Sequence, residues 1–115
     1  MAIQEALCAA LVGAGVAGGR VYPHVARDGV TKPYVTYFRM SVVPVNTLSS
    51  GRPLENTVFQ IDCYDKTTAG VNSVKDAIKA ALDAWAIKNV IQSEQDLFEP
   101  DTKLHRVTLD VSVYA

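Results

Sequence analysis

One aspartate and one lysine form a pattern in this sequence that could do chemistry. Asp101 and Lys103 stand in the Asp-x-Lys form that many metal-dependent nucleases use, and Pro100 precedes them. Such a site needs a further carboxylate on the sheet to hold the metal ion, and Asp62 and Asp65 are the candidates. The sequence lacks the cluster of basic residues that would form a phosphate-binding groove. A small metal-dependent nuclease is therefore an alternative and not the main hypothesis.

Histidine and cysteine add little catalytic potential. His105 follows the acid-rich stretch 94–101, but the spacing matches no calcium-binding loop, and we expect a solvated loop there. Cys63 falls on the apolar face of an expected strand, which favours a buried structural thiol over a nucleophile. We predict that the chain is not an enzyme: it has no catalytic residue, no metal site and no cofactor.

Composition fits one globular domain over residues 1–115. The chain has a formal net charge of -1, with 49% hydrophobic and 20% charged residues. No basic cluster is present, so nucleic acid is not expected as a primary ligand. The apolar run Ala6–Ala17 is too short to cross a bilayer and follows Glu5 instead of a basic segment, so we expect a core helix and no membrane partner.

Periodicity predicts an α+β fold. Apolar residues at helical spacing indicate helices over Ile3–Val12 and from Thr67 or Thr68 to about Ala86. Alternating or β-branched segments predict four strands, with a further short one possible at Val21: Tyr34–Val43, Asn56–Asp65, Lys88–Ser93 and Lys103–Tyr114. The order α-β-β-α-β-β, with hairpin-linked strands, predicts an antiparallel sheet whose apolar face is covered by both helices.

A long polar segment separates the first two long strands. It exceeds a tight hairpin turn, and such a loop is either functional or disordered. We take it as a candidate interaction loop, which comprises Val45, Asn46, Thr47, Leu48, Ser49, Ser50, Gly51, Arg52 and Pro53.

The other face of the sheet is expected to be polar. Alternation places Asp62, Arg106 and Asp110 opposite the apolar positions of their strands. This face is then left to solvent, to a channel or to a neighbouring subunit. Glu94 and Asp96 are included in the candidate polar surface.

Several segments, taken in order, resemble one protein family over nearly the whole chain. Each is short, and their succession carries the resemblance: Arg20–Pro23, Pro33–Tyr37, Val45–Gly51, Phe59–Tyr64 and Asp96–Arg106. The family is that of the tail completion or tail terminator (tail-to-head joining) proteins of long-tailed bacteriophages and prophages.

The resemblance implies a structural virion protein, made in the cytoplasm of the bacterial host and placed at the head-proximal end of the tail. It implies a homo-oligomeric ring, a hexamer, that caps the tail tube, stops its growth and meets the connector or neck proteins of the head. DNA would only pass through the ring. Asp62, Asp110, Glu94 and Asp96 would then give the channel an acidic lining. A monomeric ligand-binding α+β module is a further alternative.

Overall fold

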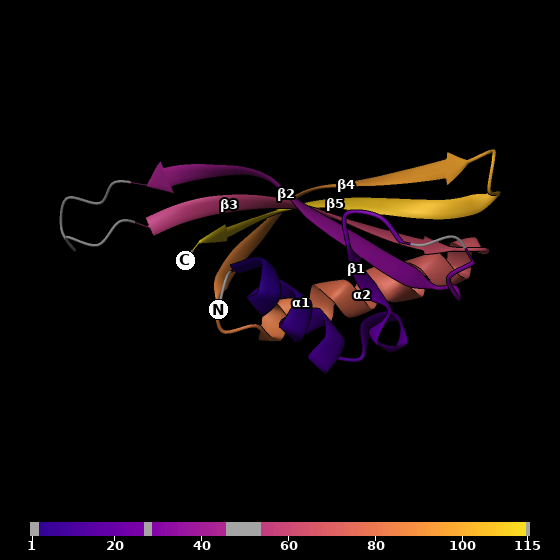
Figure 1. Ribbon diagram of the computed structural model, residues 1–115, viewed down its shortest axis with the longest axis horizontal. Coiled ribbons are helices and arrows are strands. Elements are labelled where there is room, and N and C mark those ends of the chain that lie inside the picture. The colour runs from indigo at the N-terminus through magenta and orange to yellow at the C-terminus, as the bar shows by residue number, and fades with distance from the viewer. Residues whose placement is uncertain (1–2, 27–28, 46–53, 115) are drawn as a thin grey trace.

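The computed structural model describes residues 3–26, 29–45 and 54–114. Two α-helices, a short 3-10 turn and five strands lie in these ranges. In chain order they are α1 (Ile3–Gly13), η1 (Val16–Gly19), β1 (Val21–Pro23), β2 (Tyr34–Val45), β3 (Leu54–Asp65), α2 (Thr68–Ala84), β4 (Lys88–Glu99) and β5 (Leu104–Tyr114). The expected α+β class is confirmed, and both helices lie on the same side of the sheet (Figure 1).

The sheet is mixed and has the strand order β1-β2-β3-β5-β4. All neighbouring strands are antiparallel except β1, which runs parallel to β2 beside Val35–Tyr37. The four long strands follow the predicted order α-β-β-α-β-β, and the short strand that was possible at Val21 is β1. The sheet is mixed and not wholly antiparallel, because β1 runs parallel to β2. The sequence marks Val21 as extended, but a three-residue strand carries no signal for its partner.

The core lies between the helices and one face of the sheet. The apolar stripe of α2 faces the sheet as its period predicts, with Ile78 and Leu82 fully buried. Thr67 caps this helix, since its side-chain oxygen accepts a hydrogen bond of 3.0 Å from the N–H of Gly70. Alternate residues of β3 and β5 complete the core, together with two leucines of α1: Leu7, Leu11, Phe59, Ile61, Cys63, Val107, Leu109, Val111 and Val113.

The edge strand β4 is longer than the sequence indicates. The strand expected to end at Ser93 continues to Glu99, because β5 pairs with β4 from Lys88 opposite Tyr114 to Glu99 opposite Leu104. The expected acid-rich loop is therefore largely strand. None of the residues of β4 is buried, so this edge strand tolerates charged residues that a central strand would not.

The two long outer strands bulge at the same level of the sheet. The pairing of β2 shifts between Arg39 and Ser41, and that of β4 shifts between Ile91 and Ser93. Arg39 and Ile91 lie on one row, because each pairs with a residue of a central strand and those two residues face each other. Bulges increase the local twist, and the sheet as a whole is strongly twisted (Figure 1).

The sheet is longer than its helices. The molecule extends over 50 Å, whereas α2, with 17 residues, spans only about 26 Å at the usual rise. The ends of β2 and β3 that lead to residues 46–53 therefore project beyond both helices, on the left of Figure 1.

Candidate interaction surface

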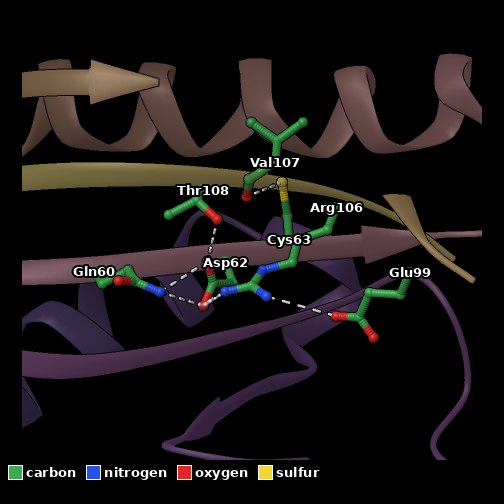
Figure 2. Close-up of polar contacts among 7 residues, drawn as sticks. All are labelled: Gln60, Asp62, Cys63, Glu99, Arg106, Val107 and Thr108. Carbon is green, nitrogen blue, oxygen red and sulfur yellow. Dashed lines mark hydrogen bonds and ion pairs between the residues drawn. The ribbon is translucent and has the colours of Figure 1, made fainter. Parts of the chain in front are cut away.

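The face of the sheet that the helices leave uncovered carries a buried acid. Asp62 is only 3% exposed, although it lies on the side of β3 opposite the core. Its carboxylate accepts hydrogen bonds of 2.6 Å from the Thr108 hydroxyl and 3.0 Å from the Gln60 amide. It also pairs with Arg106, whose nearest guanidinium nitrogen lies 3.2 Å away (Figure 2). Three side chains from two neighbouring strands thus cover and neutralise this carboxylate.

Arg106 connects Asp62 to the rest of the uncovered face. Its side chain is 25% exposed, and a second guanidinium nitrogen lies 3.6 Å from a carboxylate oxygen of Glu99 on β4 (Figure 2). The guanidinium carbon stands 5.7 Å from the centre of the Tyr64 ring, which stacks on Tyr34 at 4.7 Å. One row of contacts therefore links β2, β3, β5 and β4.

The electrostatic environment keeps the tyrosines of this row protonated. Burial raises the pKa of Tyr64, and the nearby charge of Asp62 raises it further. Burial also raises the pKa of Tyr34, with a smaller contribution from Glu99. Both phenols therefore stay protonated near neutral pH. The Tyr64 ring packs against the Arg106 guanidinium, and the Tyr34 ring stacks on Tyr64.

The predicted polar surface divides between the two faces of the sheet. Asp62 and Arg106 are in contact, and Asp110 lies on the same face, where it accepts a 3.0 Å hydrogen bond from Ser93. Glu94 and Asp96 instead pair with the core residues of β5, so they point to the helix side. The expectation of one acidic surface containing all of these residues is therefore wrong. It assumed that residues 94–99 form a loop, whereas they belong to a strand whose register fixes the face to which each side chain points.

Glu94 has a structural partner on that side. Its carboxylate forms an ion pair with Lys79 and lies 3.4 Å from the ammonium of Lys75, both on α2. The hydrogen bond from Lys79 lowers the pKa of Glu94, which keeps the acid charged. These contacts fix the edge strand β4 to the helix.

The predicted interaction loop is only partly within the described structure. Val45 is the last residue of β2 and pairs with Leu54. Asn46, Thr47, Leu48, Ser49, Ser50, Gly51, Arg52 and Pro53 lie outside the described residues.

The candidate chemistry of the sequence finds no assembled site. Within the described ranges, no group of three His, Cys, Asp or Glu side chains could hold a metal ion. Asp62, one of the two carboxylates proposed to assist Asp101 in a nuclease, is already bound by Arg106 and Thr108. Asp101 itself is exposed in the turn between β4 and β5.

Cys63 is a core thiol. It is fully buried, and its sulfur contacts the Val107 carbonyl at 3.6 Å and the Val71 carbonyl at 3.8 Å (the former is drawn in Figure 2). Burial raises the pKa of Cys63 to about 12, so the nucleophilic thiolate is scarce near neutral pH. The burial expected from its position on the strand is confirmed.

The Asp62 cluster comprises the residues joined to Asp62 directly or through Arg106, which are Gln60, Thr108, Arg106, Glu99, Tyr64 and Tyr34. Sequence reasoning missed Tyr34, Tyr64 and Glu99 as parts of this cluster. The two tyrosines are on strands that were predicted, but their stacking depends on the register, in which Tyr34 faces Tyr64 and Tyr64 faces Arg106. Alternation along each strand indicates the face of each residue and not its cross-strand neighbour.

Comparisons with known proteins agree with this architecture. A family model described as "Tail completion protein gp17" matches residues 1–115. The fold is similar to that of a chain from the virion of a native gene transfer agent particle, with a TM-score of 0.60 and 18% identity over 95% of this chain and 84% of that chain. It is also similar to a crystal structure of an Akkermansia muciniphila protein, with a TM-score of 0.50 and 9% identity over 97% of this chain and 48% of that one.

At these identities the structural likeness concerns the fold alone. No curated protein sequence matches the chain significantly. No helix in the described part of the chain is long and apolar enough to cross a membrane.

The Asp62 cluster makes a first prediction about stability. Replacing Arg106 by Met should lower the free energy of unfolding by about 2–4 kcal/mol, because the Asp62 carboxylate stays buried without its cation. Adding Asp62→Asn should restore about half of this loss, since the neutral amide needs no cation. Urea unfolding followed by circular dichroism measures both changes.

Arg39→Met is the matched control, because Arg39 is an exposed arginine of the same sheet with no ion pair among the described residues. We expect a change within about 0.5 kcal/mol for this control. An Arg106→Met variant as stable as the control would contradict the assigned role of the cluster.

The burial of Cys63 makes a second prediction. In a Cys8→Ser variant, Cys63 should react with a disulfide reagent at about pH 8 only after the protein unfolds, because the native thiol is inaccessible and protonated. Thiol release is followed by absorbance in buffer and in guanidinium chloride. A Cys63→Ala variant reports the reactivity of Cys8 separately, and rapid native labelling of Cys63 would show that the assigned burial is wrong.

Proposed function

The chain belongs to the tail completion protein family and is a structural protein of a phage-type virion, and from this premise we propose that it is the subunit of a homo-oligomeric ring, a hexamer, that caps the tail tube and joins it to the head. The observation that carries the proposal is the family match over the whole of residues 1–115. The gene transfer agent chain of similar fold, which comes from a virion, supports the same context.

The arrangement of charged and reactive side chains favours a structural role. The acid that sequence analysis placed in a possible nuclease site is neutralised by Arg106 on the uncovered face, and the core thiol is protonated. What the molecule offers instead is shape: a long twisted sheet with helices on one face and strand ends that extend past them.

The uncovered face suits the wall of a channel for DNA. Asp62 and Glu99 both pair with Arg106, and in the described strands this face also presents tyrosine rings, hydroxyls, the carboxylate of Asp110 and one further cation, Lys88, beside Tyr114. Phosphates that pass such a wall find few cations to hold them. The helices would then form the outside of the ring. The proposed wall differs from the acidic lining expected from sequence, because Glu94 and Asp96 face the helices.

A projecting β2–β3 hairpin suits contact with a neighbour along the tail axis. Its strand ends already lie beyond the helices, so the segment 45–53 starts from the extremity of the molecule (Figure 1). We assign contact with the tail tube protein or with the neck proteins of the head to this segment.

Oligomerisation is the third prediction. Purified protein should form rings in negative-stain images, with a mass in sedimentation analysis about six times that of the 12.4 kDa chain. A concentration series, with and without purified tail tubes, covers weak association. A strictly monomeric protein under all of these conditions would contradict the proposed function.

The hairpin gives the fourth prediction. Val45 and Leu54 face each other, so residues 46–53 can be replaced by Asn-Gly, the preferred two-residue turn. The variant should keep its circular dichroism spectrum and thermal midpoint but should fail to restore head–tail joining in a phage that lacks the native gene.

A Gly/Ser segment of eight residues in the same place is the control for length. It should also fail, because the side chains of the segment and not only its reach make the contact. Infectious particles at native titre with the Asn-Gly variant would show that the segment has no role in joining.

A further inference from the structure

Two edges of the sheet carry unpaired main-chain groups in the part of the chain that the structure describes. The outer edge of β2 is covered by β1 only at Val35–Tyr37. The cover ends at His24, whose N–H donates to the Tyr37 carbonyl at 2.8 Å and whose φ of 63° turns the chain away from the strand. β4 pairs with β5 on one side and has no described strand on the other.

The two free edges occupy the same end of the sheet. A row of paired residues runs from Ser41 on β2 across Val58 and Ser112 to Val90 on β4. The uncovered part of β2 and the first half of β4 therefore lie at one level, on opposite sides of the molecule. The other half of the sheet has a covered β2 edge.

The directions of these edges are complementary. β2 runs antiparallel to β3, β3 to β5, and β5 to β4, so β2 and β4 of one molecule are antiparallel. A second copy, rotated about an axis parallel to the strands, lays its β2 antiparallel against β4 of the first. Such a head-to-tail contact uses two different surfaces, and it closes into a ring when the rotation divides a full turn.

We propose that adjacent copies of this chain join by pairing the β2 segment Arg39–Val43 of one copy with the β4 segment Lys88–Ser93 of the next, so that one sheet continues around the ring. The inference rests on the proposed ring and specifies its contact. Pro44 limits the segment on β2, because it has no N–H to donate.

Exposed apolar side chains lie at the level of this contact. Met40 is 49% exposed on the β2 edge, and Val90 is 43% exposed on the β4 edge. Pairing the two edges would place a neighbouring strand against one side of each of these side chains and so cover part of their exposed apolar surface. Both strands also bulge at this level, which gives the two edges a similar local twist.

Charge distinguishes the two halves of β4. The segment Lys88–Ser93 contains no carboxylate, whereas Glu94, Asp96 and Glu99 follow in the second half. Charged residues on an exposed edge oppose strand addition, and Arg39–Val43 and Lys88–Ser93 each carry only one charged residue, at the first position of the segment. Arg39 and Lys88 reach opposite ends of the antiparallel contact, so their charges do not meet. The half of β4 that lacks acids is therefore the half that faces the free edge of a neighbour.

Paired substitutions on β4 test the contact. Val90→Lys should raise the protein concentration needed for ring formation by about tenfold or more, which corresponds to about 1.4 kcal/mol per contact. Leu97→Lys is the matched control, because Leu97 is 44% exposed and lies on the same face of the same strand, in the half that carries acids. It should assemble as the native chain does. Thermal unfolding shows that both variants fold.

Cross-linking tests the geometry independently. In a Cys8→Ser background, a chain with Ser41→Cys and Val90→Cys should form a ladder of disulfide-linked oligomers on mild oxidation, and Gln92→Cys in place of Val90→Cys detects a shift of register. Either substitution alone should give no linked dimer. Linked dimers of the Val90→Cys chain alone would show a β4–β4 contact and would overturn the proposal.

The results separate this inference from the proposed function. If both lysine variants form rings, and rings of the double-cysteine chain give no β2–β4 cross-link, the ring stands and this contact is refuted. A protein that forms no rings under any condition would refute both. Rings lost with Val90→Lys and kept with Leu97→Lys, together with the ladder, would establish the contact.

Discussion

The structure depends on a mismatch between its sheet and its helices. Strands of twelve residues span about 40 Å, whereas α2 spans about 26 Å. Both helices lie on one face of the sheet, and they cover only part of its length. The chain must satisfy the remaining face with its own side chains, and its strand ends and edges stay available to other molecules.

On the uncovered face, the Asp62 cluster satisfies the buried polar groups with side chains of the chain itself. A buried carboxylate is costly unless hydrogen bonds and a cation replace its water, and here Thr108, Gln60 and Arg106 do so. These partners come from β3 and β5 at one register, and a slip by one residue would move Asp62 into the apolar core. The cluster therefore favours one alignment of the two central strands more than it adds to the total stability.

Features that depend on residues close in the sequence could be predicted, and features that depend on distant residues could not. Helices, the Thr67 cap and the alternation of β3 and β5 depend on neighbours within a few residues, and these predictions are confirmed. The parallel pairing of β1 with β2 and the extension of β4 to Glu99 depend on distant strands, so local patterns missed them. The facing of Glu94 was missed for the same reason: its partners, Lys75 and Lys79, stand on another element.

These properties suit the proposed ring of identical copies. A domain of 115 residues has a small core, and each free edge leaves main-chain groups that only another strand or water can satisfy. Because the described parts of β2 and β4 are antiparallel and have unpaired edges at the same end of the sheet, one copy in the proposed ring would supply the strand partner that the next requires. The second half of β4 carries acids and so does not compete for the same partner. The geometry thus favours a contact that repeats in one direction, which is the requirement for a closed ring and not for a pair.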